Sequence, residues 1–418
     1  MTKQELIQKG IKIFEAHGWD TQRATFIKHP DGFHRGLIDN RFGNWGKFKK
    51  ACQKFLDDGA MPVQDQQEEP EEEEPQTPPE LQHLIKQNDA QRKKIEKLCN
   101  TNQIIVDHCL ASISKCLFKP AKLPPAEKVK TPLEFHAMRS DDHVGEYVSA
   151  EGTQGLGGFN KDIFVTRNDR WTQKVVTFRE QDKASLGLNK LVIYMLGDHV
   201  TGEVIYAGQA YQIDMASVDQ LFFCLNEYVK TILTLAGVFP EIEIFCVIGN
   251  HGRMAKKGEG HPRSNLDYVL FRSLQNALER QTNVNIFVSE SPTMLVQNGN
   301  FNFALNHNDG VKGYQGIPYY GLERKARRLS DLYGVRIHHK LGGHFHTPAN
   351  LADETILNGT IVGGSDLSIN KMNVATRPSQ KIFYFDPEHG INRESNLYLA
   401  EPVNLTPDSN GIYTAYTA

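Results

Sequence analysis

The sequence contains no hydrophobic run long enough to cross a membrane. Its longest strongly apolar stretch is residues 191–196, whereas a membrane-spanning helix needs about 20 consecutive apolar residues. The first twenty residues carry charges in place of the apolar core of a secretion signal. The six cysteines form no Cys-x-x-Cys pair and no zinc-binding spacing. We therefore expect a cytoplasmic protein with reduced thiols and no membrane partner.

A balanced overall charge conceals one strongly basic segment. The chain has a formal net charge of −3, with the 23% charged and 39% hydrophobic content of a globular protein. Within residues 21–56, however, eight Lys and Arg residues are opposed by only two Asp. Such a concentration of positive charge is typical of phosphate-binding surfaces, although a solvated helix face would have the same composition.

The end of this basic segment, "RFGNWGKFKKACQKFL", resembles a homing-endonuclease-associated repeat, which is a short helical DNA-binding module. The resemblance implies that residues 1–60 form a small basic helical domain with DNA as its partner. Apolar residues at helical spacing within 6–14 and 45–55 agree with a helical unit.

Two segments with different patterns follow the basic unit. Residues 61–80 are rich in Glu and Pro and cannot bury apolar surface, which predicts a disordered linker. Residues 81–118 keep an alternating three–four spacing of partly apolar positions, which predicts one long helix. Asn88 and Asn102 occupy two of these positions, as in coiled coils whose register is fixed by Asn. The helix either pairs with a second copy in a homodimer or packs on the domain that follows.

Metal-binding residue types follow five apolar segments of the remaining chain. These residues are Asp141 and His143 after "LEFHAM", Asp198 after "KLVIYML", Asn250 and His251 after "EIEIFCVI", His307 after "FNFAL", and His344 and His346 after "GVRIHHKL". The apolar segments read as strands, and layered α/β folds place ligand sites at the carboxyl ends of strands. The spacing between successive groups fits one strand–helix–strand connection each time. We therefore expect these side chains to converge on one site.

The order Asp-x-His, Gly-Asp, Gly-Asn-His, His and Gly-His-x-His resembles the calcineurin-like metallophosphoesterase superfamily over residues 130–370. The resemblance implies an α/β (α+β) fold in which a layered β-sandwich core, flanked by helices, fills residues 125–418. It implies that Asp141, His143 and His346 hold one metal ion. It also implies that Asn250, His307 and His344 hold a second ion and that Asp198 bridges the two.

Oxygen and imidazole ligands without thiolate favour Mn²⁺, with Fe or Zn²⁺ as alternatives. Two such ions clamp a phosphoryl group and supply a bridging hydroxide that attacks phosphorus. In this interpretation His251 donates a proton to the leaving oxygen, and Arg253 binds a non-bridging oxygen of the phosphate. The superfamily usually has an acidic residue after Gly-Asn-His, where this chain has Gly252. We therefore expect Asp141 or the adjacent Asp142 to support His251.

Four further histidines, at positions 136, 199, 338 and 339, fall outside the five groups and are interpreted as non-ligands. Basic clusters at 256–263 and 324–328, with Tyr314, Tyr319 and Tyr320 between them, suit an extended polyanion, although the tyrosines would equally suit a core. Together with the basic unit, they favour a DNA nuclease of the SbcD-like branch. The alternatives are a phosphatase or phosphodiesterase for nucleotides or phosphoproteins, and a non-catalytic DNA-binding scaffold.

Overall fold

The chain forms two units, Met1–Ile85 and Lys86–Ala418, which are considered separately. The structure is a computed structural model, and it describes residues 3–17, 38, 42, 44–58, 86–87, 89–90, 93, 118–153, 155–261, 263–311, 318–371 and 373–401. The predicted linker at 61–80 lies outside these residues. So does most of the predicted helix at 81–118, although its described residues 86–87, 89–90 and 93 are helical. The coiled-coil interpretation therefore stays a prediction.

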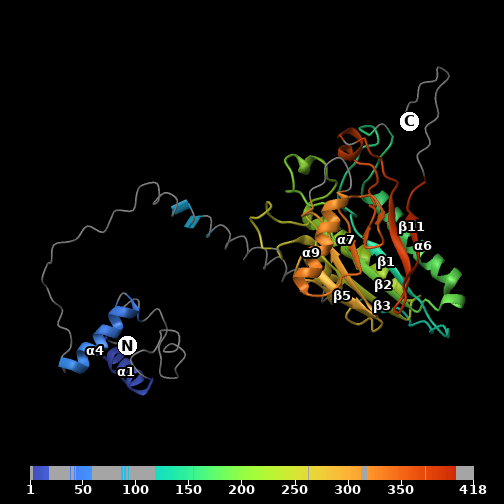
Figure 1. The fold of residues 1–418 in the computed structure, drawn as a ribbon. Coiled ribbons are helices and arrows are strands. Elements are labelled where there is room, and N and C mark those ends of the chain that lie inside the picture. The colour runs from blue at the N-terminus through green and yellow to red at the C-terminus, as the bar shows by residue number, and fades with distance from the viewer. Residues whose placement is uncertain are drawn as a thin grey trace, which may run out of the picture. The chain divides into compact units, whose positions relative to one another are not determined.

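The first unit has a small core of its own. Its two described helices are α1 (Lys3–His17) and α4 (Trp45–Asp58), shown in blue in Figure 1. Leu6 and Phe14 of α1 pack against Phe48 and Cys52 of α4, and all four side chains are fully buried. The Phe14 ring centre lies 5.7 Å from that of Trp45. These apolar residues recur three or four positions apart, so each helix buries one face and exposes the other.

The second unit contains a six-stranded sheet with the order β11–β10–β1–β2–β3–β4. Strands β1 to β4 run parallel, and β10 and β11 add antiparallel pairs at one edge. The strands are β1 (Glu134–Arg139), β2 (Lys190–Met195), β3 (Glu241–Cys246), β4 (Val284–Val288), β10 (Ser379–Asp386) and β11 (Gly390–Tyr398). Because β1, β2 and β3 are parallel neighbours, their carboxyl ends lie at the same edge of the sheet.

A five-stranded sheet with the order β5–β6–β7–β9–β8 forms the second layer. Strands β6, β7 and β9 are parallel, and antiparallel β5 and β8 occupy the edges. The strands are β5 (Thr293–Asn298), β6 (Phe301–Asn306), β7 (His339–Gly342), β8 (Ala349–Leu351) and β9 (Thr355–Leu357). Tyr194 and Phe245 of the first sheet share a buried core with Phe303 and Leu341 of the second, so the two sheets form a sandwich.

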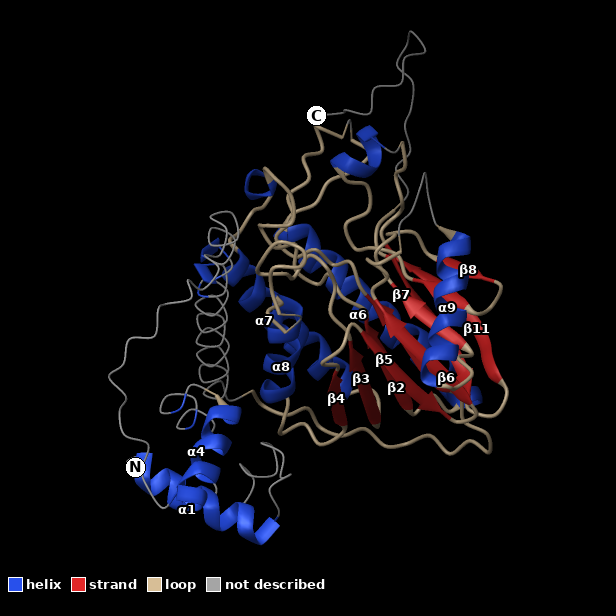
Figure 2. Cartoon of the chain, turned by 60° about the vertical axis from the view of Figure 1, so that its left-hand side comes forward, coloured by secondary structure: helices blue, strands red, loops and turns tan. Residues whose placement is uncertain are grey.

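Helices cover both outer faces of this sandwich. The other elements are α6 (Lys161–Leu186), α7 (Ser217–Ala236), α8 (Leu266–Ala277), α9 (Tyr319–Tyr333) and the short turns η1 (Gln209–Tyr211) and η2 (Leu367–Lys371). Helices α6, α7 and α8 share the largest core with the first sheet, whereas α9 lies over the second sheet (Figure 2). The predicted layered α/β fold with a β-sandwich core is therefore confirmed. Among the described helices, none has the length and apolar character needed to cross a membrane.

All five segments expected to precede the site are strands: β1, β2, β3, β6 and β7. The predicted connection between His251 and His307 is wrong, however. It contains α8, then β4, and then the β5–β6 hairpin, because the chain completes the first sheet and crosses to the second within this interval. The length of the gap alone could not reveal two additional strands.

Candidate metal centre

Three of the predicted ligands lie close together. Asp141 and His143 follow β1, and His346 follows β7. His143 Nε2 lies 3.1 Å from His346 Nε2, and His346 Nε2 lies 3.3 Å from Asp141 Oδ1. The backbone N–H of His344 donates to both carboxylate oxygens of Asp141, at 3.0 and 3.1 Å, and so ties the two strand ends together. The ligand atoms of Asp141, His143 and His346 all lie within 4.8 Å of one another, as the ligands of one ion require.

A second trio joins the end of β2 to the second sheet. Asp198 Oδ2 lies 2.8 Å from His307 Nε2, and the His307 and His344 rings are 5.1 Å apart. Asp198 also belongs to a third group, with His143 and His251, whose ligand atoms are equally close. Asp198 is therefore the carboxylate shared between neighbouring groups, which is the position predicted for a bridging ligand.

Asn250 adds an unpaired acceptor at the end of β3. Its side-chain Oδ1 is buried, and no described residue donates a hydrogen bond to it. An unpaired buried carbonyl is unfavourable by about 1–3 kcal/mol, so such an atom calls for a partner that protein groups do not provide. The full set of carboxylate, amide and imidazole donors, without thiolate, fits divalent ions such as Mn²⁺, Fe²⁺ or Zn²⁺. The structure thus brings all seven predicted ligand residues to neighbouring strand ends, and they fit the expected metals.

The buried charges at this centre shift one another's pKa values. Burial favours the neutral form of Asp141, but the adjacent His346 outweighs it and lowers the pKa of Asp141 to about 2. Burial likewise disfavours His307 as a cation, yet the Asp198 carboxylate raises the pKa of His307 to about 10. Burial and the charge on His307 lower the pKa of His344 to about 4. Such opposed shifts within one small cluster are characteristic of functional sites.

The backbone is strained at the same positions. Positive φ angles occur at five of the seven predicted ligands, namely Asp141 (54°), His143 (45°), Asp198 (56°), His344 (80°) and His346 (56°). Left-handed backbone at a non-glycine residue costs on the order of 1–3 kcal/mol and is retained mainly where function requires it. A side chain at Gly249 would strike the Asp198 carboxylate, and one at Gly343 would strike Asp141. Glycine at both positions lets these carboxylates approach the neighbouring loops.

A hydrogen bond to its distal ring nitrogen orients His307. His307 Nδ1 lies 2.7 Å from the carbonyl oxygen of Leu196, which leaves Nε2 directed at Asp198. A partner of this kind fixes the tautomer and direction of a metal-binding histidine. Glu146 Oε2 lies 3.6 Å from His143 Nδ1, which is an electrostatic contact and longer than a hydrogen bond. Glu146 escaped sequence reasoning because a single carboxylate three residues after His143 has no distinctive pattern.

The expected carboxylate support for His251 is wrong. His251 Nδ1 faces the carbonyl oxygen of Thr201 at 3.0 Å, so the β2 loop supports it. Asp142 instead pairs with buried Arg139, whose Nε lies 2.8 Å from Asp142 Oδ2, and also contacts His199. Asp141 lies beside His346 and accepts the backbone N–H of His344, so neither carboxylate is directed at His251.

The four histidines interpreted as non-ligands lie outside all three groups of candidate ligands found among the described residues. His136 is a core residue, hydrogen bonded to Glu134 and Tyr194. His199 contacts Tyr228 Oη at 2.5 Å, on the side of the first sheet that the helices cover. His338 and His339 contact backbone groups of the second sheet. Their interpretation as non-ligands agrees with this geometry.

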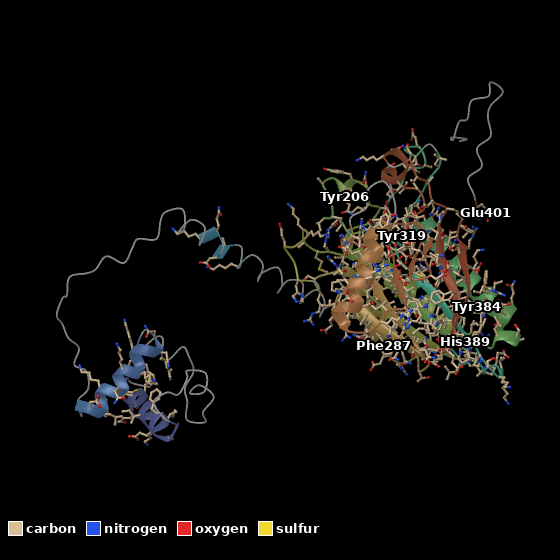
Figure 3. The ribbon with its side chains drawn as sticks, viewed as in Figure 1. Tyr206, Phe287, Tyr319, Tyr384, His389 and Glu401 are labelled. Carbon is tan, nitrogen blue, oxygen red and sulfur yellow. The ribbon has the colours of Figure 1, made fainter. Side chains whose placement is uncertain are left out.

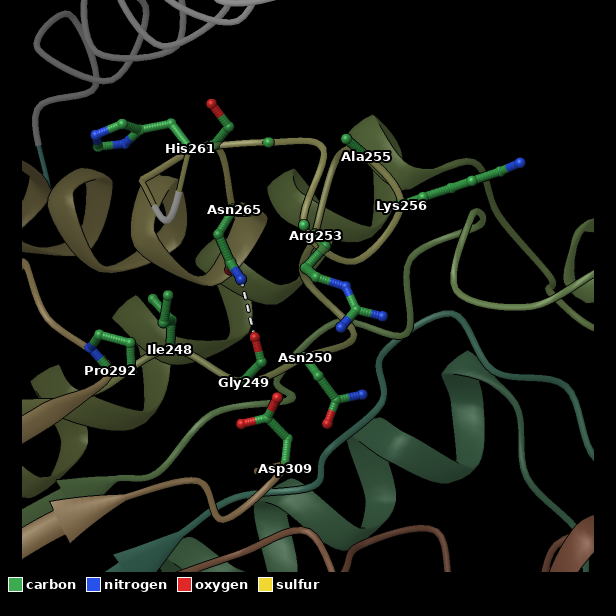
Figure 4. A pocket seen from close by; sticks show the side chains of 13 residues that line it. Ile248, Gly249, Asn250, Arg253, Ala255, Lys256, His261, Asn265, Pro292 and Asp309 are labelled. Carbon is green, nitrogen blue, oxygen red and sulfur yellow. Dashed lines mark hydrogen bonds between the residues drawn. The ribbon is translucent and has the colours of Figure 1, made fainter. Parts of the chain in front are cut away.

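Asp267 is a buried residue of the site that sequence reasoning missed. It lies in the first turn of α8 and accepts hydrogen bonds from three backbone N–H groups: Asp198 at 2.9 Å, His199 at 3.1 Å and Gly249 at 2.9 Å. The α8 N-cap Asn265 also donates to the carbonyl of Gly249 at 2.9 Å (Figure 4). One helix start therefore holds both the β2 and β3 loops. The only sequence signal was the Asn-x-Asp pattern of a helix N-terminus.

We expect Asp267→Asn to weaken metal binding by roughly 10–100-fold. The amide nitrogen of Asn is a donor, so only the amide oxygen could still accept a backbone N–H. Metal titration of the purified variant measures the loss. The matched control is Asp219→Asn, an exposed carboxylate in the first turn of α7. Equal metal affinity for Asp267→Asn and the native chain would show that this carboxylate does not position the loops.

A cavity of about 130 Å³ adjoins the centre at the end of β3. Asn250, Arg253, Lys256 and Asp309 are among its lining residues, and Figure 4 shows the Arg253 guanidinium on the same side as the Asn250 side chain. Arg253 Nε is buried and donates to none of the described residues. Arg253 thus has free donor capacity beside a predicted metal ligand.

Comparisons with known proteins give only distant likenesses. No family model and no curated protein matches the chain. Among solved structures, Vps29 from Entamoeba histolytica, crystallised with Zn²⁺, is 12% identical, with a TM-score of 0.26 over 63% of this chain and 99% of that chain. The hypothetical protein PH1004 from Pyrococcus horikoshii OT3 is also 12% identical, with a TM-score of 0.30 over 63% and 87%. Likenesses this weak decide neither family nor function. The inference about function therefore uses the geometry of the site.

Proposed function

We propose that this protein is a two-metal phosphoesterase of the calcineurin-like metallophosphoesterase superfamily. The observation that carries the proposal is the sharing of Asp198 between close groups of ligands, beside the unpaired Oδ1 of Asn250. Asp141, His143 and His346 would hold one ion, and Asn250, His307 and His344 the other. When bound, the two cations supply Lewis acidity and an activated water for hydrolysis of a phosphate ester. Mn²⁺ is the favoured metal.

His251 is the proposed proton donor to the leaving oxygen. With Nδ1–H donating to the Thr201 carbonyl, its Nε2 is the nitrogen left to exchange a proton with substrate. Its ring lies edge-on to that of His143, with centres 4.5 Å apart, so it stands beside the predicted ligands. Imidazole is suited to this task because its protonation changes near neutral pH.

Arg253 is the proposed phosphate-binding residue. Its unpaired Nε and its place in the cavity beside Asn250 leave the planar guanidinium able to form two parallel hydrogen bonds to a phosphate. Lys256, which lines the same cavity, adds a second positive charge. These residues would neutralise the non-bridging oxygens while His251 serves the leaving group.

Within this reaction class we propose DNA as the substrate, as in the SbcD-like nucleases. Exposed aromatic rings on the second unit, which holds the candidate metal centre, support a polymeric substrate. Tyr206 is 50% exposed, Tyr319 41% and Tyr320 83%, and the first two are labelled in Figure 3. Base stacking on such rings contributes about 1–3 kcal/mol per base. In the first unit, Lys47, Lys50 and Lys54 lie along the exposed side of α4, opposite its buried face.

Cutting the chain near residue 72 tests whether the first unit binds DNA. Residues 81–418 should stay folded, because the two units have separate cores. This fragment should hydrolyse a small phosphodiester as fast as the full chain does. Each lost phosphate contact flattens the fall of log affinity with log salt by about 0.9, so losing three contacts lowers the slope by roughly three units. DNA-binding titrations at several salt concentrations measure the slope.

The full-length variant with Lys47, Lys50 and Lys54 all changed to Gln is the matched control, because it keeps the helix and removes only the charges. It should reproduce most of the flattening. Identical slopes for full-length, truncated and triply substituted proteins would contradict the DNA-binding role of residues 1–60. Digestion of linear and circular DNA with Mn²⁺ then tests the nuclease activity itself, since a phosphatase for nucleotides or phosphoproteins, or a non-catalytic scaffold, would leave both intact.

A further inference from the structure

Strand β7 carries a fully buried lysine that the proposed reaction does not use. Leu341 points into the core between the sheets, so its neighbour Lys340 points to the opposite face, over which α9 lies (Figure 2). Lys340 Nζ is buried and has no hydrogen-bond partner among the residues that the structure describes. Burial and the nearby Lys325 lower the pKa of Lys340 to about 7. A lysine so placed is strongly destabilising as a cation unless something pairs with it.

A second lysine from α9 approaches the same place. Lys325 Nζ donates to Asn306 Oδ1 at 2.6 Å, and Asn306 shares the outer face of the sheet with Lys340. Lys325 also lines a cavity of about 450 Å³, together with Arg324 and Arg328. Its pKa is lowered by burial, with Asp309 opposing the shift. The region between α9 and β7 therefore holds an excess of positive charge.

Asn308 supplies unpaired amide atoms to this region. It is fully buried, and within the described part of the chain neither Oδ1 nor Nδ2 has a hydrogen-bond partner. Its amide lies against Gly342, which shares a face of β7 with Lys340, so closely that a side chain at Gly342 would strike it. Another buried lysine of the catalytic unit, Lys381, has Glu394 as an ion-pair partner. Lys340 and Asn308 therefore differ from Lys381, because no described residue pairs with them.

We propose that Lys340, Lys325 and Asn308 form a second site, independent of the metal ions, for a small oxyanion such as inorganic phosphate. Phosphate carries the negative charge that two ammonium groups require and the acceptor oxygens for the Asn308 amide N–H. Monohydrogen phosphate also has one O–H to donate to Asn308 Oδ1. A water molecule carries no charge with which to balance a protonated Lys340. A nucleic acid backbone is too bulky to reach an ammonium and an amide that are both fully buried.

Equilibrium dialysis of the Mn²⁺-loaded full chain against radiolabelled phosphate tests the site by stoichiometry. Phosphate that binds at the metal centre is common to all variants and cancels. Lys340→Met should lose one equivalent of bound phosphate, or bind it at least about tenfold more weakly, because a charge-assisted hydrogen bond is lost. Lys381→Met is the matched control and should keep both equivalents. If the metal centre also binds phosphate, the native chain should bind two equivalents and Lys340→Met one. If the metal centre does not bind phosphate, these counts should be one and zero. Failure of the proposed metal centre can therefore be distinguished from failure of the second site.

Stability supplies a second readout. In phosphate-free buffer, Lys340→Met should unfold at the same or a higher temperature than the native chain, because an apolar side chain replaces an unpaired buried amine. Added phosphate should raise the unfolding temperature less in this variant. Lys325→Met, at a residue that lines the open cavity, should also weaken phosphate binding, and it serves if Lys340→Met fails to fold.

Equal phosphate stoichiometry and affinity in the native chain, Lys340→Met and Lys325→Met would overturn the proposal. If Lys340→Met does not fold, unchanged phosphate binding by Lys325→Met would overturn it alone. Binding of an oligonucleotide without terminal phosphates shows whether the ligand of this site is a free anion or a polymer. Its affinity should not depend on Lys340, and a tenfold loss in Lys340→Met would replace the small anion with nucleic acid.

Discussion

Replacing Asp198 with Ala should reduce hydrolysis by about 10⁴-fold or more, the scale on which removal of one member of a catalytic unit lowers kcat. Asp198 is the carboxylate that belongs to two of the three groups of candidate ligands. Its Oδ2 lies 2.8 Å from His307 Nε2, while its Oδ1 accepts the backbone N–H of His251 at 2.7 Å. The change to Ala therefore removes the proposed bridge between two ions and one anchor of the β3 loop.

Elemental analysis of Asp198→Ala should find one bound metal ion or none. Asp198→Asn separates the two effects, because an amide oxygen can still accept from His251 but cannot supply the carboxylate charge between two cations. We expect Asn to preserve the unfolding temperature of the metal-free protein better than Ala does, and to lose activity almost as fully. Two tightly bound ions per chain in Asp198→Ala would remove Asp198 from the bridging position.

The strands that precede the site were predictable because their sequences are locally distinctive. Four of the five are short apolar runs that end in Gly or Asn beside a polar ligand, as in "YMLG" before Asp198 and "CVIGN" before His251. A buried parallel strand needs apolar side chains on both faces, so the run itself reveals the element. The carboxyl ends of parallel neighbours then coincide, which brings the ligands of β1, β2 and β3 together.

The remaining features of the site depend on contacts between distant parts of the chain. Asp267 holds the Asp198 loop from 69 residues away, and the Thr201 carbonyl holds His251 from 50 residues away. Neither contact has a local pattern, because a carboxylate or a backbone carbonyl can accept a hydrogen bond anywhere in a fold. The same holds for Lys340, whose residue type suggests a solvent-exposed position but whose neighbour Leu341 fixes it beneath α9.

The change His251→Ala should keep both metal ions and slow turnover of DNA by roughly 10²–10⁴-fold, as expected for a lost general acid. A nitrophenyl phosphodiester should lose much less activity, because its leaving oxygen departs without a proton. Parallel kinetics on the two substrates measure the difference. The exposed His389 at the β10–β11 turn (Figure 3) offers a matched control, and His389→Ala should leave both rates unchanged.

Metal content decides between two roles for His251, because its ligand atom falls within 4.8 Å of those of His143 and Asp198. A proton donor can be removed without loss of metal, whereas removal of a ligand lowers metal content and slows both substrates alike. The hydrogen bond from Nδ1 to the Thr201 carbonyl leaves Nε2 to serve in either role. Full metal content with a selective loss on DNA would support the proton donor. Equal losses on both substrates, or a missing ion, would exclude it.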